Sequence, residues 1–207
     1  GVEKNLIIIK NYLCKKISNI KICSLSLNKR NKFDKKIKFI SPSLKVARNL
    51  NIKIKYLICL YTLLKFLLKN KNSIVFTFQA NIYCVLLCKL LNIKVIVRNN
   101  SSPSGWNHNI FKKLIYKYIM SKSDKIIVNS LDFQKQMKKK LNIKTECILN
   151  PLNISEIIRE SKRKIYQNYF RKKTLLKIIN IGRFTDQKDQ ITILKAANIL
   201  KEHLNFE

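Results

Sequence analysis

Histidine and acidic residues are scarce in this sequence of 207 residues. It has two histidines and 11 aspartates and glutamates, against 43 lysines and arginines. Structural zinc sites combine four cysteine or histidine ligands. Cys84 and Cys88 are four residues apart, but no second pair stands at ligand spacing, so we expect no zinc centre. We expect the six cysteines to be buried apolar side chains in a reducing compartment, because they lie in apolar stretches of a chain too large to need disulfides: Cys14, Cys23, Cys59, Cys84, Cys88 and Cys147.

Long apolar runs are also absent. The most apolar stretch, YLICLYTLLKFLL at residues 56–68, has 13 residues and contains Lys65, whereas a membrane-spanning helix needs about 20. The first residues, GVEKN, do not resemble a secretory signal peptide. We therefore expect a cytoplasmic protein. Because the sequence opens on Gly1 instead of methionine, we expect the natural polypeptide to begin upstream.

The net charge of +32 is the most unusual feature that is present. Proteins that bind nucleic acid or anionic membranes carry charge of this sign. Here the excess is mainly lysine and is spread along the whole chain, and heavy use of Lys, Asn and Ile is what an AT-rich coding sequence produces. Aromatic residues such as Phe76 and Phe78 lie inside apolar runs instead of alternating with basic ones, unlike a nucleic-acid-binding surface. We expect mainly a compositional origin, next an anionic membrane surface, and least of all nucleic acid.

Short β-branched runs alternate with segments that have helical spacing. Strands are predicted at 19–27, 36–40, 73–79, 94–98, 124–129 and 145–149. Helices are predicted at 3–16, 50–68, 80–91 and 109–121, and from the N-cap Ser130 to Leu141. Strands joined through helices form a parallel sheet by right-handed crossovers. Residues 1–149 therefore predict a doubly wound α/β domain.

Ligands of such sheets bind at the carboxyl ends of the strands. Polar residues that follow predicted strands there include Gln79, Arg98 and Asn99. These three and Glu3 are our candidates for contact with an acceptor substrate. His108 directly follows the loop predicted at 99–107, and we expect its side chain to be solvated.

The sequence changes character after residue 149. Residues 150–173 are polar and highly charged, and we interpret them as a connector. The run LLKIINIG at 175–182 predicts a buried strand, so a second domain begins at about residue 174. Only one strand and one helix of it precede Glu207, which is too little to enclose a core.

The stretch NIGRFTDQKDQ at residues 180–190 joins that strand to the helix. Gly182 permits a sharp turn, and Thr185 or Asp186 is expected to cap a helix with an apolar inner face. Arg183 and Lys188 flank the expected start of the helix, an arrangement suited to phosphate. In a lysine-rich chain the same junction also arises by chance. The inner face comprises Ile193, Ala197, Leu200 and Leu204.

Residues 178–201, IINIGRFTDQKDQITILKAANILK, resemble the start of the second domain of retaining glycosyltransferases of the GT-B fold, known as group 1 or family 4. Three other stretches, all earlier in the chain, also resemble the family and occur in the family's order. GVEKN looks like the tail of the glycine-rich loop after a first strand, SDKIIVNS like an Asp, apolar strand and Ser, and CILNPLN like a strand and Asn turn before the linker. The resemblance implies a Rossmann-like first domain that lacks its first strand, followed by the first β-α unit of a nucleotide-sugar domain.

The resemblance also implies a function. The first domain would bind a glycan or lipid-linked acceptor, and the second a UDP- or GDP-sugar, in cell-envelope synthesis such as that of lipopolysaccharide at the inner face of the membrane. Gly182, Arg183 and Lys188 would hold the donor diphosphate, with Gly1 in a loop on its opposite side. No cofactor or metal is implied, and the sequence has no Asp-x-Asp cluster.

Two departures from the family stand out. Many members have a histidine where this sequence has Arg98, Asn99 and Asn100, and the pair of glutamates that recognises the donor sugar would lie beyond Glu207. We therefore expect the chain alone to be inactive. A sugar-nucleotide epimerase of the same fold and a basic nucleic-acid-binding module are the alternatives.

Overall fold

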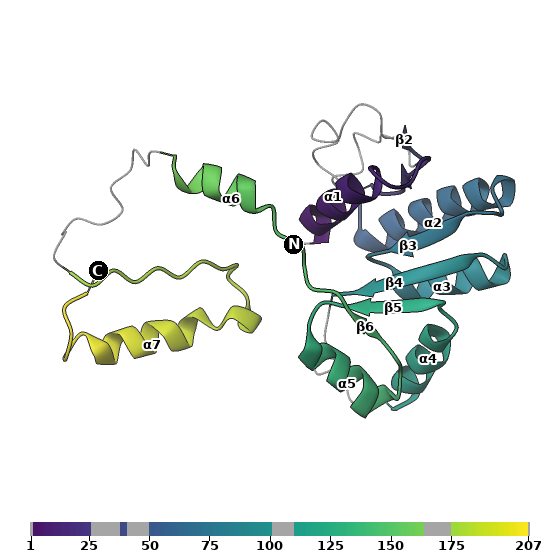
Figure 1. The fold of residues 1–207 in the computed structure, drawn as a ribbon. Coiled ribbons are helices and arrows are strands. Elements are labelled where there is room, and N and C mark those ends of the chain that lie inside the picture. The colour runs from purple at the N-terminus through teal and green to yellow at the C-terminus, as the bar shows by residue number, and fades with distance from the viewer. Residues whose placement is uncertain (1, 26–37, 41–49, 101–109, 164–174, 207) are drawn as a thin grey trace. The chain divides into compact units, whose positions relative to one another are not determined.

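The computed structural model of the chain describes residues 2–25, 38–40, 50–100, 110–163 and 175–206 (Figure 1). The chain divides into two compact units, Gly1–Asn153 and Ile154–Glu207. The first unit is built on parallel strands with helices between them, which confirms the predicted parallel α/β architecture.

The main sheet of the first unit has four parallel strands in the order β3-β4-β5-β6. Short runs of Val and Ile form them because β-branched side chains pack well on a sheet that is buried on its faces. In register, Val75 pairs with Val95 and Val97 pairs with Ile126. The strands are β3 (Ile74–Thr77), β4 (Lys94–Asn99), β5 (Lys125–Val128) and β6 (Glu146–Cys147).

Three helices connect these strands and share one hydrophobic core with them. They are α3 (Asn81–Leu90), α4 (Ile110–Ser121) and α5 (Leu131–Leu141). Side chains alternate across a strand, so Val95 and Val97 of β4 enter this core while Arg98 lies on the opposite face. The fully buried members of the core include Val85, Cys88, Met120, Val128 and Met137.

Two helices of the first unit begin at a side chain that caps the helix. The predicted N-cap Ser130 is confirmed, since its Oγ accepts a hydrogen bond of 3.1 Å from the Phe133 N–H. Helix α2 (Ile52–Lys69) begins after Asn51, whose Oδ1 accepts from the Lys53 N–H at 3.1 Å. Such caps satisfy amides that have no partner within the helix.

The amino-terminal part of the first unit forms a second, smaller sheet. Helix α1 (Val2–Leu13) precedes β1 (Lys21–Ile22), which pairs in parallel with β2 (Lys38–Phe39). Ile22 packs against Leu6 and Ile7 of α1. Both strands fall within the segments predicted at 19–27 and 36–40, but residues 26–37 lie outside the described part of the chain.

The second unit contains helices α6 (Ile154–Ser161) and α7 (Gln190–Leu200) and the 3₁₀ helix η4 (Asp186–Lys188). The strand predicted at 175–182 is wrong: only Leu176 pairs, in an isolated bridge with Phe206, and Ile181 is 93% exposed. A strand needs neighbouring strands to bond its amides and carbonyls, and the described residues of this unit supply none. The predicted β-α unit thus has its helix but not its strand.

Helix α6 was not predicted, because its segment was interpreted as part of a connector. Its signal is the spacing of Ile154, Ile157 and Ile158, which places three apolar side chains on one helix face. All three are exposed. Among the described residues of the second unit none is fully buried.

The structure describes all six cysteines. Cys84 and Cys88 are buried, whereas Cys14 is exposed, contrary to the prediction that every cysteine is buried. Cys14 directly follows Leu13, the last residue of α1. No helix in the described segments is long and apolar enough to cross a bilayer.

Candidate functional site

Polar side chains form a continuous hydrogen-bond network at the carboxyl ends of β3 and β4. Asn81 Nδ2 donates to Asn99 Oδ1 at 2.8 Å and to the Arg98 carbonyl at 3.2 Å. Asn81 Oδ1 lies 3.1 Å from Thr77 Oγ1, whose single proton is shared with the nearer Gln79 carbonyl. Asn99 Nδ2 in turn donates to Tyr116 Oη at 2.8 Å. We call Thr77, Asn81, Asn99 and Tyr116 the carboxyl-edge network.

Three elements position the carboxyl-edge network. Asn81 is the first residue of α3, which follows Ala80 in the left-handed conformation with φ of 54°. Asn99 ends β4 and is only 5% exposed, and Tyr116 reaches it from α4. Burial raises the pKa of Tyr116 to about 12, although the bond from Asn99 lowers it in part. The phenol therefore stays protonated at neutral pH, and the network is uncharged.

Arg98 crosses from β4 to the chain that follows β6. Its side chain is 1% exposed, and Nη2 donates to the carbonyls of Ile148 at 2.9 Å and Leu149 at 3.3 Å and to Asn150 Oδ1 at 3.1 Å. Burial lowers the pKa of Arg98, but an arginine stays charged at neutral pH. Within the described segments no carboxylate forms an ion pair with it, and its Nε has no hydrogen-bond partner there. Arg98 thus ties strand β4 to residues 148–150, the segment that follows β6.

Asn150 links this anchor to the first helix. Its Oδ1 also accepts a hydrogen bond of 2.7 Å from Asn5 Nδ2 in α1. Helix α1 therefore begins at the carboxyl ends of the strands. Glu3, in its first turn, is exposed at the same end.

The structure thus brings the candidates Gln79, Arg98 and Asn99 to one edge of the sheet, with Glu3 at the same end. They differ in what they can reach: Gln79 and Glu3 are exposed, whereas Arg98 and Asn99 are buried and bonded to protein groups. Gln79 is held through its carbonyl, which accepts from Thr77 Oγ1 at 2.6 Å. Gly1 and His108 lie outside the described residues.

Tyr116 and Asn150 are parts of this site that sequence reasoning missed. Tyr116 could have been found, because it lies three and four residues before the buried Ile119 and Met120 and so on the same helix face. Asn150 has no comparable local signal, since its partner Asn5 is 145 residues away.

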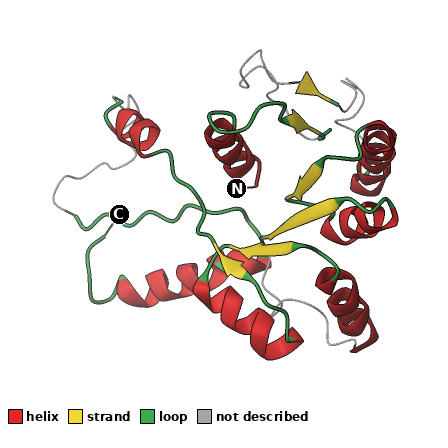
Figure 2. Cartoon of the chain, turned by 45° about the vertical axis from the view of Figure 1, so that its right-hand side comes forward, coloured by secondary structure: helices red, strands yellow, loops and turns green. Residues whose placement is uncertain are grey.

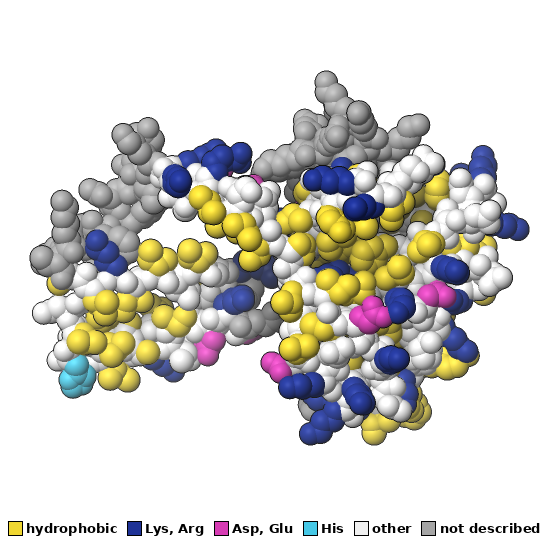
Figure 3. All heavy atoms as spheres, in the orientation of Figure 1, with side chains coloured by type: hydrophobic (Ala, Val, Ile, Leu, Met, Phe, Trp, Pro, Cys, Tyr) yellow, Lys and Arg dark blue, Asp and Glu magenta, His cyan; other side chains and the backbone are white. Residues whose placement is uncertain are grey.

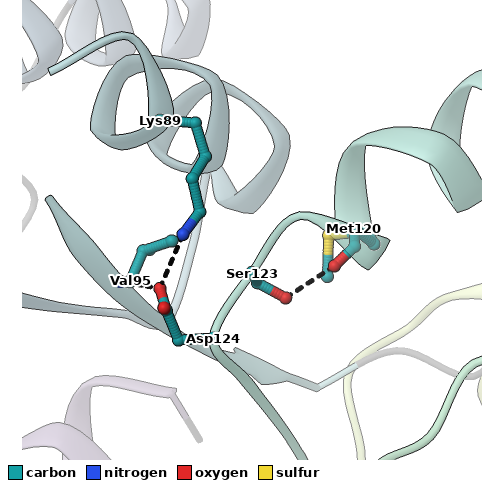
Figure 4. Close-up of polar contacts among 5 residues, drawn as sticks. All are labelled: Lys89, Val95, Met120, Ser123 and Asp124. Atoms are coloured by element: carbon teal, nitrogen blue, oxygen red, sulfur yellow. Dashed lines mark hydrogen bonds and ion pairs between the residues drawn. The ribbon is translucent and has the colours of Figure 1, made fainter. Parts of the chain in front are cut away.

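Asp124, the acidic residue of SDKIIVNS, lies at the opposite, amino-terminal edge of the sheet (Figure 4). Its Oδ2 accepts from the Val95 N–H at 2.8 Å and from Lys89 Nζ at 2.9 Å, and its own N–H donates to the Val95 carbonyl at 3.0 Å. Partial burial acts to raise the pKa of Asp124, but the bonds from Val95 and Lys89 outweigh it, so the pKa lies below its ordinary value. Asp124 joins β4 to β5 and takes no part in the carboxyl-edge site.

Residues 182–190 of the second unit form a closed turn. Gln190 Nε2 donates to the Arg183 carbonyl at 2.8 Å. A Cβ on Gly182 would lie 3.2 Å from Gln190 Nε2 and 3.6 Å from Lys188 Cγ. Gly182 does not adopt a left-handed conformation, and a side chain there would require Gln190 to shift slightly. Arg183 and Lys188 are both exposed, and neither forms an ion pair with any described residue.

The predicted caps of the following helix are wrong. Helix α7 begins at Gln190, and Asp189 caps it by accepting from the Thr192 N–H at 3.4 Å. Asp189 has φ of 45°, and the left-handed turn that this produces separates η4 from α7. Thr185 precedes η4 but makes no side-chain cap, and Asp186 lies within η4. We had predicted that the free amides at the start of this helix would bind an anion. The Asp189 carboxylate bonds to one of these amides, that of Thr192.

Of the predicted inner face of α7, Ile193, Ala197 and Leu200 lie on the less exposed side of the helix, whereas Leu204 lies beyond its end at Leu200 and is 50% exposed. Ile193 and Leu200 are 36% and 39% exposed, against more than 60% for Ile191, Leu194 and Ile199. In the described part of the chain no three His, Cys, Asp or Glu side chains come together closely enough to hold a metal ion. No family model and no curated protein matches the sequence.

Proposed function

We propose that this chain is part of a retaining glycosyltransferase of the GT-B fold, which transfers a sugar from a nucleotide-sugar to a glycan or lipid-linked acceptor. The observation that supports it most is the turn at 182–190. This turn presents two exposed cations, Arg183 and Lys188, five residues apart, directly before a helix.

These two side chains suit a diphosphate. The planar guanidinium of Arg183 can bind two phosphate oxygens at once, whereas the ammonium of Lys188 acts as a point charge. Asp189 already caps α7, so the side chains and not the helix amides would hold the phosphates. Their role is to stabilise the negative charge that develops on the departing nucleotide. Donor groups that stabilise developing charge in an oxyanion hole are worth about 3 kcal/mol each.

The first unit would hold the acceptor. A parallel α/β sheet binds ligands at the carboxyl ends of its strands, where Gln79 and Glu3 are exposed. The carboxyl-edge network behind them is neutral, and its amides and phenol are suited to positioning loops around a polyhydroxylated ligand. The scattered lysines, visible over the face drawn in Figure 3, would hold the enzyme at an anionic membrane, where each nearby lysine adds about 1 kcal/mol.

Calorimetric titration with UDP and GDP tests the donor half of this proposal. Replacing Arg183 or Lys188 by alanine should weaken binding about tenfold each, which corresponds to roughly 1.4 kcal/mol. Lys195→Ala is the matched control, because Lys195 is an exposed lysine within α7. If all three variants bind as the parent chain does, or if all three lose affinity equally, Arg183 and Lys188 do not form the site.

A further inference from the structure

The amino-terminal strand pair β1-β2 is attached to helix α2 through Lys21 and Cys23. Lys21 lies over the Phe66 ring of α2, with its Nζ 4.6 Å from the ring centroid. Two residues further along, Cys23 Sγ lies 3.4 Å from the Cys59 carbonyl of α2. Figure 2 shows β1-β2 with α1 on one side and α2 on the other. The contact between Cys23 and Cys59 joins segments that are 36 residues apart in the sequence.

Cys23 and Cys59 form a pair of neighbouring thiols. A hydrogen bond with the Cys59 side chain is the largest cause that raises the pKa of Cys23, and burial is the next. Both side chains are partly exposed, and neither is in a disulfide with another described residue. A small oxidant in solution can therefore reach the pair.

The two thiols have different roles toward such an oxidant. The nucleophile in these reactions is the thiolate. Because its pKa is raised, Cys23 stays a thiol at neutral pH, so the first attack on the oxidant falls to Cys59. A cysteine sulfenic acid condenses with a thiol beside it to form a disulfide. Cys23 has the position of this second thiol.

We propose that Cys23 and Cys59 are a site of reversible disulfide formation in response to a peroxide, and that the bond fixes β1-β2 covalently on α2. The Cys59 sulfur attacks the O–O bond of hydrogen peroxide, takes one oxygen as a sulfenic acid and releases water. The Cys23 sulfur then displaces the sulfenic hydroxyl, which leaves as a second water with the proton of Cys23. Two thiols are thus oxidised to one disulfide while one peroxide is reduced. In a reducing compartment such a bond is transient.

Cys84 of α3 is the competing partner. It lies near the pair, since it contributes to the raised pKa of Cys23. However, it is only 8% exposed and forms a hydrogen bond with Thr77, and burial raises its own pKa. We therefore expect Cys59 to bond to Cys23 and not to Cys84. The inference is independent of the proposed function, because neither cysteine of the pair belongs to the turn at 182–190 or to the carboxyl-edge network.

The test treats the reduced full chain with hydrogen peroxide at neutral pH, blocks the remaining thiols and maps tryptic peptides by mass spectrometry. The product should join ICSLSLNK, residues 22–29, to YLICLYTLLK, residues 56–65, with the loss of two hydrogen atoms. It should form within one molecule, disappear with dithiothreitol and exceed every other cysteine pair at least about tenfold. Cys147→Ser, at another partly exposed cysteine, should leave the yield unchanged.

Trapping with dimedone, which labels sulfenic acids, tests the order of the two steps. Cys59 should be labelled in the Cys23→Ser variant, whereas Cys23 in the Cys59→Ser variant should be labelled at least about tenfold less. Circular dichroism checks that both variants fold. The oxidised parent chain should also unfold at a higher urea concentration than the reduced one, because the bond closes a loop in the unfolded chain.

Three results would overturn the proposal. The first is a disulfide that forms only between Cys59 and Cys84, or only between two molecules. The second is oxidation of Cys59 to the sulfinic acid with no link to Cys23. The third is dimedone labelling of Cys23 in preference to Cys59, which would contradict the assigned roles.

Discussion

Asn99 donates a hydrogen bond of 2.8 Å to Tyr116 Oη, and this bond ties the end of strand β4 to helix α4. Asn99 is buried and Tyr116 is partly buried, so an unmade hydrogen bond at this place would be costly. The same asparagine accepts from Asn81, and the network therefore fixes the strand ends from which the loops of the candidate acceptor site begin.

Tyr116→Phe should destabilise the first unit by about 1–2 kcal/mol, because it leaves Asn99 Nδ2 without an acceptor. Tyr118→Phe is the control, since Tyr118 is exposed on the same helix, and its effect should stay within about 0.5 kcal/mol. Urea denaturation followed by circular dichroism measures both. Equal effects would show that the bond to Asn99 does not contribute.

Arg98→Lys should destabilise the first unit by about 2–3 kcal/mol, although it keeps the charge. All three bonds, to the carbonyls of Ile148 and Leu149 and to the Asn150 side chain, come from Nη2 at the tip of Arg98, and the ammonium of the shorter lysine side chain does not reach that position. Amide exchange at residues 148–150 should rise in the variant. Arg159→Lys, at an exposed site on α6, should leave stability unchanged within about 0.5 kcal/mol. An unchanged midpoint for Arg98→Lys would contradict the anchoring role.

Asp124→Asn should cost about 1 kcal/mol at neutral pH, a value reduced for the partial exposure of the carboxylate. The pKa of Asp124 is lowered in the folded protein, so its contribution is present above the pKa of the unfolded chain and is lost as the pH falls through the folded pKa. The difference in unfolding free energy between parent and variant should therefore shrink below the ordinary aspartate pKa. A difference that stays constant down to strongly acidic pH would contradict this account.

Glu146→Gln is the matched comparison for Asp124. Glu146 pairs with Lys125 but both side chains are more than half exposed, so the substitution should cost no more than about 0.5 kcal/mol. Comparing the losses of unfolding free energy in the two variants separates two contributions. One is the hydrogen bond that the Val95 N–H donates to Asp124, and the other is a surface ion pair alone.

Much of the first unit could be predicted from sequence, because buried parallel strands leave a strong signal of consecutive β-branched residues. The segments that form β3, β4 and β5 are of this kind. Ser130 marks the start of α5 because serine is a common N-cap residue. The strand predicted at 175–182 has the same composition, yet it did not form. Composition reports the tendency to be a buried strand, whereas the strand itself requires partners, and the described part of the second unit has none.

The candidate site was predictable in place but not in detail. Strand polarity alone sends Gln79, Arg98 and Asn99 to one edge of the sheet. The burial of Arg98 was not predictable, because its partners are main-chain carbonyls about 50 residues away, and any sequence could provide them. The start of α7 was missed because Asp189 adopts a left-handed conformation. Aspartate tolerates this conformation, but its presence in a sequence does not predict it.

Mapping nucleoside diphosphate binding by amide chemical shifts tests the central claim most directly. UDP and GDP are titrated in turn into the isotopically labelled chain, and perturbed amides are located along the sequence. The account predicts saturable shifts centred on residues 182–190, lost in an Arg183→Ala, Lys188→Ala double variant. Shifts scattered over the lysine-rich surface of both units, unchanged in that variant, would contradict it.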